Sequence, residues 1–279
     1  MSKLLVMPNN TNIEELDKYT DAYLFGLKDY SVNVPCEITL EELKNIKTDK
    51  DIFLSMNRNM FNEDISKLKE ILKDIDSYNL KGIFYADTCF INLKDELNIK
   101  TPLVWSQEHL TTNYETINFW ATYGIKYTYL SGEITKEEIK EIIKKAESKI
   151  IVPIFGHLPM FVSARHIVKN YLTTFNLKDD SKTNFIENDN HIYPIIDNEI
   201  GTMVYSDYIL DGYEEMEELN ADYYTLNEFN IDRNTFIEVL KKYNNLGGNY
   251  ELNTSKGFLY QATIYKVKWS QNYLLQLET

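Results

Sequence analysis

Polar side chains follow the ends of several apolar runs in this sequence. Asn57-Arg58 comes directly after Asp51–Met56, and Gly156-His157 comes directly after Lys149–Phe155. Amide, imidazole and guanidinium groups brought together in this way can hold an anionic or hydroxylated molecule by charge and hydrogen bonds. The sequence therefore predicts a small anionic ligand. The predicted ligand-binding residues are Asn57, Arg58, Ser106, Gln107, His157, Ser163, Arg165 and His166.

Four residues could transfer protons in a reaction. The candidate catalytic residues are Asp87, Glu108, Glu133 and His157. A carboxylate or an imidazole within reach of a substrate can serve as a general acid or base. Glu108 and Glu133 could equally be first-turn acids that the dipole of the following helix favours. Helix capping explains Asp87 less well, because this residue ends an apolar run. The catalytic residues therefore stay open.

The sequence contains no known hydrolase or zinc motif. It has no G-x-S-x-G nucleophile elbow and no H-E-x-x-H helix, and the spacings of His157, His166 and His191 match no zinc pattern. Cys89 could be a thiol nucleophile, although a small buried cysteine after a strand is the commoner arrangement. With Cys36 as the only other cysteine, no disulfide framework is expected. We predict no metal site.

Arginine is rare in this sequence. Only Arg58, Arg165 and Arg233 occur among 29 basic residues. The guanidinium group is a planar fork that binds a carboxylate or phosphate through two parallel hydrogen bonds, which lysine cannot do. Where lysine is the default cation, an arginine can mark a position that needs this fork. The pattern favours Arg58 and Arg165 as anion ligands.

Apolar strands alternate with amphipathic helices along the chain, and this alternation predicts a (β/α)8 barrel of the TIM type. Parallel strands joined by helices bring their carboxyl ends to one face, where such barrels carry their sites. An open doubly wound sheet is the competing fold, but Asn9-Asn10-Thr11 stands where that fold needs a glycine-rich turn. The expected strands are Lys3–Met7, Ala22–Phe25, Asp51–Met56, Gly82–Ala86, Leu103–Ser106, Tyr127–Leu130, Lys149–Phe155 and Tyr223–Leu226.

The expected helices begin at recognisable capping residues. Thr39 and Thr135 are each followed three residues later by glutamate, which is the pattern of a capping box. The expected helices are Glu14–Leu16, Thr39–Lys44, Glu63–Tyr78, Tyr114–Tyr123 and Lys136–Glu147. Since no linker interrupts residues 1–279, we predict one domain, with an irregular segment at 167–200 and a β-rich tail at 245–279.

Composition narrows the function classes. The net charge of −14 disfavours stand-alone binding to nucleic acid, since phosphates need clustered lysine and arginine. The longest apolar runs, such as Ile150–Phe155, are far shorter than the roughly 18 residues that span a bilayer, so no membrane association is expected. Met1–Asn10 does not have the pattern of a signal peptide. We predict a soluble cytoplasmic protein.

One run of residues resembles a known family. The segment Ile154–His166, which reads IFGHLPMFVSARH, is similar to the F-G-[HR]-L-P-x-x-x-S-x-R-C segment of the peptidase U32 family. Tyr129–Ile139 resembles the family's L-S-R-E-L-T-L-x-E-I stretch, and Ser106-Gln107 with Asn113 resembles its S-x-Q-x-x-x-x-N stretch. Gly201-Thr202 and the run Thr254–Tyr260 are similar to later family features. The chain is identified as a divergent member of this family.

The resemblance implies a barrel-like fold and several alternative activities. Some members are described as collagenase-like peptidases, and others hydroxylate RNA bases or quinone precursors with a [4Fe–4S] cluster held by four cysteines. In this sequence His166 stands where the family motif has a cysteine, and no cysteine follows it. We therefore expect no iron–sulfur cluster or other cofactor, and no redox hydroxylation by this chain alone.

Three functions remain open. The first is an active or degenerate enzyme that binds a small anion at the carboxyl-terminal face of the barrel. The second is a non-catalytic subunit that pairs with a cluster-bearing U32 homologue in RNA or cofactor-precursor modification. The third is a peptidase, for which the sequence shows no nucleophile paired with a base.

Overall fold

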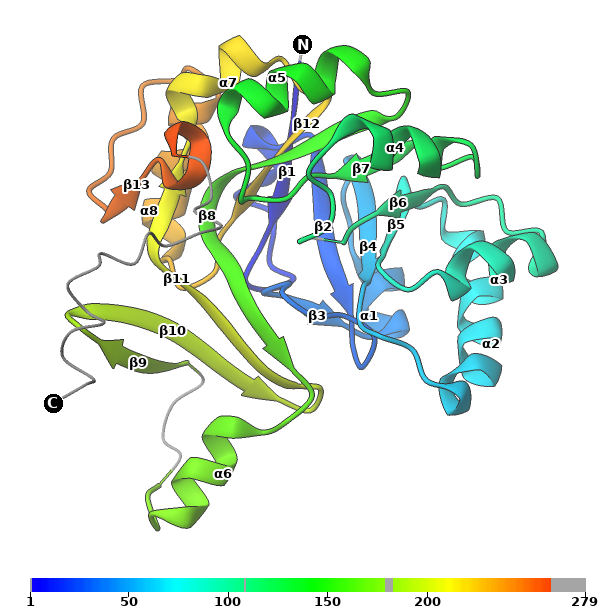
Figure 1. Ribbon diagram of the computed structural model, residues 1–279, viewed down its shortest axis with the longest axis horizontal. Coiled ribbons are helices and arrows are strands. Elements are labelled where there is room, and N and C mark those ends of the chain that lie inside the picture. The colour runs from blue at the N-terminus through cyan, green and yellow to red at the C-terminus, as the bar shows by residue number, and fades with distance from the viewer. Residues whose placement is uncertain (1, 108, 179–182, 262–279) are drawn as a thin grey trace, which may run out of the picture.

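A computed structural model of the protein describes residues 2–107, 109–178 and 183–261, and a closed barrel of parallel strands forms its centre (Figure 1). In pairing order, the barrel strands are β12 (Tyr223–Asn227), β1 (Lys3–Met7), β2 (Ala22–Leu27), β4 (Asp51–Met56), β5 (Gly82–Tyr85), β6 (Leu103–Trp105), β7 (Tyr127–Tyr129) and β8 (Lys149–Ser163). The ring closes because β12 pairs in parallel with both β1 and β8. The predicted (β/α)8 barrel is confirmed.

Helices follow most of these strands and cover the outside of the barrel (Figure 1). They are α1 (Leu40–Asn45), α2 (Ile65–Ile75), α3 (Cys89–Leu97), α4 (Tyr114–Ala121), α5 (Lys136–Lys145), α7 (Tyr213–Leu219) and α8 (Arg233–Tyr243), with 3-10 turns η1 (Asp17–Tyr19), η2 (Asn62–Asp64), η3 (Asp76–Tyr78) and η4 (Gly257–Tyr260). Both predicted capping boxes are present, at Thr39 and at Thr135. The helix expected at Glu14–Leu16 is wrong, since these residues form a turn that leads into η1.

The barrel interior is filled by side chains, which gives the site above it a rigid floor. Phe53 lies at its centre, with ring centroids 5.7 Å from Phe84, 5.9 Å from Tyr127 and 5.5 Å from Tyr223, all near edge-on. Such edge-to-face contacts are favourable for aromatic rings. The barrel interior itself therefore has no room for a ligand among the described residues, and the carboxyl ends of the strands are where such barrels carry their sites.

Strand β8 continues beyond the barrel and starts a second, antiparallel layer. It pairs with β11 (Gly201–Asp211), which pairs with β10 (His191–Asn198), which pairs with β9 (Asn184–Asn188); helix α6 (Ile167–Thr174) packs against this sheet. We call residues 157–211, apart from 179–182, the arm. In Figure 1 it extends below the barrel on the left. The arm forms one wall of the cleft described below.

The arm corrects two expectations. Strand β8 was expected to end at Phe155 but runs to Ser163, and Pro159 is tolerated within it because it pairs with Tyr205 at a break in the register, where no ladder hydrogen bond from its nitrogen is required. The segment 167–200, expected to be irregular, contains α6, β9 and β10. Its strands are half-exposed and rich in asparagine, so their alternation of polar and apolar residues is weak.

About half of the predicted β-rich tail, residues 245–261, falls within the described residues. Between 245 and 261 the chain forms only β13 (Thr254–Ser255), which pairs with β11, and η4. Residues 262–279 lie outside the described part. A further short strand, β3 (Glu37–Ile38), pairs with β2. None of the helices in the described ranges has the length and apolar character needed to traverse a bilayer.

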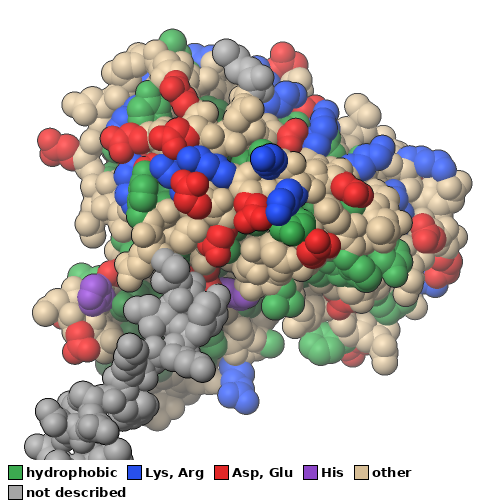
Figure 2. All heavy atoms as spheres, turned by 45° about the horizontal axis from the view of Figure 1, so that its top comes forward, with side chains coloured by type: hydrophobic (Ala, Val, Ile, Leu, Met, Phe, Trp, Pro, Cys, Tyr) green, Lys and Arg blue, Asp and Glu red, His purple; other side chains and the backbone are tan. Residues whose placement is uncertain are grey.

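Charged side chains on the helical surface pair with one another. Lys136 and Lys140 of α5 lie 3.1 and 3.0 Å from the carboxylate of Glu218 in α7. Figure 2 shows acidic and basic side chains interspersed over the face on which these helices lie. Interspersed charges of this kind keep a surface solvated and form no concentrated basic area for nucleic acid.

Candidate functional site

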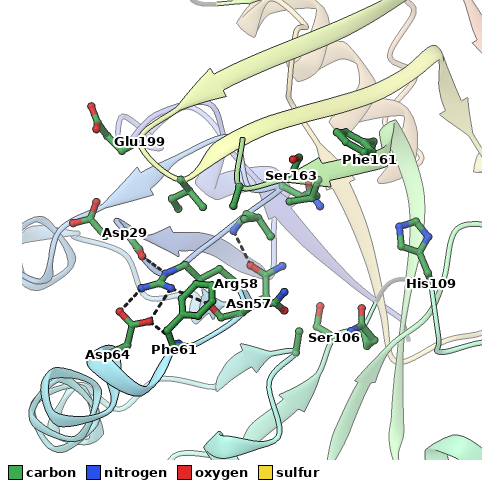
Figure 3. A pocket seen from close by; sticks show the side chains of 18 of the residues that line it. Asp29, Asn57, Arg58, Phe61, Asp64, Ser106, His109, Phe161, Ser163 and Glu199 are labelled. Carbon is green, nitrogen blue, oxygen red and sulfur yellow. Dashed lines mark hydrogen bonds and ion pairs between the residues drawn. The ribbon is translucent and has the colours of Figure 1, made fainter. Parts of the chain in front are cut away.

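An open cleft of about 690 Å³ lies between the carboxyl ends of the barrel strands and the arm (Figure 3). The barrel contributes Asn57, Arg58 and Phe61 after β4, and Ser106 and Gln107 after β6. The arm contributes residues 160–164 and Ile200. The cleft thus has polar groups on the barrel side and apolar side chains on its walls, where Phe61 and Phe161 are 60% and 45% exposed.

A small chamber of about 30 Å³ continues from the cleft into the barrel mouth. Its polar lining includes Ser55, Asn57, Ser106, His157 and Asn227, all of them buried. The hydroxyl of Ser55 is fully buried and makes no hydrogen bond with any described residue. An unpaired buried hydroxyl is costly, and this chamber has room for about one water or for the tip of a ligand. The chamber is the deepest part of the candidate site.

Two asparagine side chains in the chamber are fixed by backbone contacts. The Oδ1 atom of Asn57 accepts a hydrogen bond from the backbone nitrogen of Val32 at 2.9 Å. The Oδ1 atom of Asn227 accepts one from the backbone nitrogen of Phe229, also at 2.9 Å. Because the oxygen atoms are used in this way, the amide nitrogens of both residues remain as hydrogen-bond donors for a ligand.

His157 lies in the chamber as a neutral imidazole. Its Nδ1 atom is 2.7 Å from the backbone oxygen of Ser206, so Nδ1 carries the proton and Nε2 remains an acceptor. Burial lowers the pKa of His157, because the charged form is poorly solvated there. At neutral pH this side chain offers a ligand a hydrogen-bond acceptor and no positive charge.

Arg58 lines the cleft, but its guanidinium group is held by the protein itself. Nη1 and Nη2 donate to the two carboxylate oxygens of Asp64 at 3.0 and 2.7 Å, and Nη1 and Nε also donate to the backbone oxygens of Asn59 and Asp29. Figure 3 shows Arg58 turned towards Asp29 and Asp64. An incoming anion would therefore have to displace Asp64.

The pairing of Arg58 with Asp64 predicts a pH-dependent loss of stability. Hydrogen bonding to Arg58 lowers the pKa of Asp64. Replacing Arg58 with methionine should lower the free energy of unfolding at pH 7 by about 1–2 kcal/mol. A depressed carboxyl pKa contributes stability above the ordinary aspartate value of about 3.9 that is lost as the pH falls through the lower folded value. Urea unfolding should show the difference between the two proteins shrinking below that pH; a constant difference would contradict this role.

The cleft is lined by more negative than positive charge. Asp29, Glu63, Asp64 and Glu199 stand against the single guanidinium of Arg58. Like charges concentrated in a cleft repel an anion and favour a neutral or cationic molecule. The lining charge therefore disfavours the small anionic ligand that the sequence predicted.

The remaining predicted ligand residues lie apart from the chamber. Ser163 lines the cleft from the arm. Arg165 is exposed on the arm and is not among the cleft residues. His166 lies next to it, and its Nδ1 atom is 2.8 Å from the carboxylate of Asp197, a residue of β10. Both roles in ligand binding stay predictions without geometric support.

The predicted catalytic carboxylates do not meet in one place. The carboxylate of Asp87 accepts hydrogen bonds from the backbone nitrogens of Cys89 and Met60, which ties the start of α3 to the neighbouring loop. Glu133 lies 3.6 Å from His109 in a second cavity beside the cleft. Glu108 lies outside the described residues. The structure thus gives Asp87 a structural role and groups only His157 with the chamber.

The cysteines do not form the donor set of a [4Fe–4S] cluster. The sequence has only Cys36 and Cys89, whereas the cluster takes four thiolates. Burial raises the pKa of each thiol to about 12, which opposes the thiolate form that a metal needs. His166, at the position where the resemblance places a cysteine, hydrogen bonds to Asp197. Among the described residues, no group of three or more histidine, cysteine or acidic side chains could hold a metal ion.

Ser55 and Asn227 are among the chamber residues that sequence reasoning missed. Ser55 is a polar residue on the inward face of an otherwise apolar strand, two positions after Phe53. Asn227 comes directly after the expected strand Tyr223–Leu226 and so belongs to the same class of position as Asn57. The period of two in a strand was the signal for Ser55, and the strand-end rule was the signal for Asn227.

The cleft stands where barrel proteins carry their sites. The model of peptidase family U32 matches residues 12–232, so the chain belongs to peptidase family U32. Over 260 residues it is 26% identical to tRNA hydroxylation protein P2 of Bacillus subtilis, a match that covers 86% of this chain and 84% of that protein.

Two other relatives match over shorter stretches. The chain is 24% identical to tRNA hydroxylation protein P1 of Bacillus subtilis over 159 residues, which are 55% of this chain and 38% of that protein. It is 29% identical to an uncharacterized protease of Methanocaldococcus jannaschii over 168 residues, which are 56% of this chain and 40% of that protein. The chain is therefore similar to P2 over most of both lengths and to the other two over only part of theirs.

Proposed function

We propose that this protein acts in tRNA hydroxylation as a subunit without an iron–sulfur cluster, together with a cluster-bearing member of the same family. The single observation that carries this proposal is the similarity to tRNA hydroxylation protein P2 over most of both chains. The two cysteines of the chain, both with raised pKa, support a division of labour in which another subunit holds the cluster.

In this proposal the cleft receives an uncharged part of the RNA, namely a base turned out of its stack. Proteins read single-stranded RNA by stacking bases on aromatic side chains and hydrogen bonding to their polar edges. Phe61 and Phe161 supply exposed rings on the two walls, and Asn57, Asn227 and Ser55 supply donors in the chamber. The acidic lining suits a neutral base better than a phosphate group.

The other two functions receive less support. A small anion would meet four carboxylates and an arginine that is already paired. A peptidase needs a nucleophile activated by a base, but in the described residues none of the hydrogen bonds of His157, His166 and His191 goes to a serine, threonine or cysteine side chain.

Deletion of the gene tests the role in tRNA. Nucleosides from the tRNA of the deletion strain and the parent should be compared by liquid chromatography and mass spectrometry. We expect a hydroxylated nucleoside to disappear and to return when the gene is restored. An unchanged nucleoside profile would refute the proposed function.

Matched variants then test the cleft. Complementation with Phe61→Ala/Phe161→Ala should reduce the hydroxylated fraction about tenfold, since stacking on an aromatic side chain contributes about 1–3 kcal/mol per base. Phe185→Ala removes an equally exposed ring of the arm that does not line the cleft, and it should restore the nucleoside fully. Equal complementation by both would show that the cleft does not bind the base.

Native mass spectrometry tests the subunit claim separately. Protein purified from its host without oxygen should carry a second U32-family chain and iron bound to that chain. A monomer without iron would contradict the partnership but would leave a role in tRNA modification to the deletion experiment.

A further inference from the structure

A second cavity, of about 230 Å³, lies beside the cleft and shares His109 and Met160 with it. Its walls carry four aromatic side chains from four separate parts of the chain, and two carboxylates face the same space. The aromatic residues are Tyr129 of β7, Tyr193 of β10, Tyr208 of β11 and Phe258 of η4. The carboxylates are Glu133, between β7 and α5, and Asp207 of β11.

The charges of both carboxylates reach the same side chain of the cavity, that of Tyr208. Burial raises the pKa of Tyr208, and the negative charges of Asp207 and Glu133 both raise it further. The hydroxyl of this tyrosine is therefore within the electrostatic influence of both acids, although they lie on different elements. Neither lysine nor arginine is among the residues that line the cavity.

A histidine lies beside each of the two acids. His109 lies 3.6 Å from Glu133, and His191 hydrogen bonds to Asp207. Both imidazoles are at least half exposed. A metal ion is a poor occupant, because no group of three metal-binding side chains occurs among the described residues.

We propose that this cavity binds an organic ammonium group. A cation of this kind gains from the faces of tyrosine and phenylalanine rings and from a nearby carboxylate, and it needs no fixed coordination geometry. The four aromatic side chains are half-buried, and both contributions are stronger at a partly desolvated site than in open water. The inference does not depend on the proposed role in tRNA hydroxylation, because Glu133, Asp207, Tyr193, Tyr208 and Phe258 line neither the chamber nor the cleft.

Choline and its uncharged analogue 3,3-dimethylbutan-1-ol provide the test, since they have nearly the same shape. Calorimetric titration of the full chain at pH 8 should show saturable binding of choline, with the analogue at least about tenfold weaker. Equal affinities would mean that the cavity recognises apolar surface, and no binding of choline would mean that it is not an ammonium site. Either result would overturn the proposal.

Variants assign the binding to this cavity. Asp207→Asn keeps the size of the side chain. It should lower the affinity for choline about fivefold to tenfold without changing the affinity for the analogue. Tyr171→Leu alters an exposed ring of α6 outside the cavity and should change neither. Circular dichroism of each variant confirms that it is folded. If Asp207→Asn binds choline as tightly as the parent, the assignment is wrong.

Competition experiments identify the source of the ammonium group. Spermidine represents a free amine, and a peptide with a trimethylated lysine represents a protein side chain. The competitor that displaces choline at the lower concentration indicates which source the cavity fits. If neither displaces choline, the choline site cannot be an ammonium site of biological use, and the proposal fails.

Discussion

Replacing Gly156 with alanine is expected to lower the free energy of unfolding by about 3–4 kcal/mol, a large part of the 5–15 kcal/mol that typically stabilises a domain. Gly156 has a φ angle of +115°, a backbone conformation that residues with a Cβ atom rarely adopt. A Cβ atom at this position would lie 2.7 Å from both the backbone oxygen and the Cβ atom of Asn227. The substitution thus adds a steric clash to backbone strain.

The clash cannot be relieved by a small local movement. Gly156 lies where β8 leaves the barrel, and Asn227 is the last residue of β12, the strand that closes the ring against β8. Strand β12 is also paired along its full length with β1, and β8 is paired with β7 and β11. Moving either strand would break hydrogen bonds on its other side, so the strain stays in the folded state.

Gly124 provides the control. It also has a positive φ angle, of +77°, but a Cβ atom there would meet nothing within 4 Å. Gly124→Ala should therefore cost only the backbone strain, about 1 kcal/mol. Urea unfolding followed by circular dichroism measures both variants. Equal losses would show that the close approach of β8 to Asn227 does not matter; valine at 156 should be worse than alanine.

The barrel could be predicted because its signal repeats along the chain. Seven of the eight expected strands agree with the structure to within two residues, as in the case of Asp51–Met56, which is β4 without change. Each strand is buried on both faces and forms a short apolar run, and each is separated from the next by turn or helix residues. A repeated pattern of this kind leaves few alternative folds.

The arm could not be predicted in the same way. Its strands carry one half-exposed face. Their pairing is antiparallel and joins residues far apart in the sequence, such as His157 with Ile209. Nothing in the local sequence of β8 shows that it continues past Gly156, because glycine and Pro159 usually end strands. Tertiary pairing with β11 overrides that local preference.

The strand-end rule brought several predicted residues together, but it did not give the charge of the cleft around them, and their roles in ligand binding stay predictions. Asn57, Ser106 and His157 line the chamber as the ends of barrel strands should. A sequence cannot tell whether a guanidinium fork will hold a ligand or a carboxylate of the protein. Arg58 holds Asp64, and Arg233 holds Glu228. Two of the three arginines do use the planar guanidinium group for a bidentate contact, but the partner is a carboxylate of the protein itself, so these two contacts stabilise the fold.

Replacing Arg233 with methionine is expected to cost about 3–4 kcal/mol, more than the same change at Arg58. Nε and Nη2 of Arg233 donate to the carboxylate oxygens of Glu228 at 2.6 and 3.1 Å, and Nη1 donates to the backbone oxygen of Asn12 at 2.6 Å. The side chain of Glu228 is only 1% exposed, whereas that of Asp64 is 17% exposed. Loss of Arg233 therefore leaves a buried carboxylate without its cation.

A second substitution separates the buried charge from lost packing. Glu228 also accepts a hydrogen bond from the backbone nitrogen of Asn9 at 2.7 Å, which a glutamine oxygen can replace. The double variant Glu228→Gln/Arg233→Met should therefore recover about 1–2 kcal/mol relative to Arg233→Met alone, because no unpaired charge remains. Arg165→Met is the surface control and should change stability by less than about 0.5 kcal/mol.

Urea unfolding at pH 7 compares the four proteins, and the order of stability decides the argument. We expect the free energy of unfolding of Arg165→Met to be close to that of the parent and that of Arg233→Met to be the lowest. The double variant should lie between these two. If the double variant is no more stable than Arg233→Met, the loss comes from the hydrogen bond to Asn12 and from packing of the arginine stem. The contact between the ends of β1 and β12 would then owe its stability to the shape of Arg233 and not to its charge.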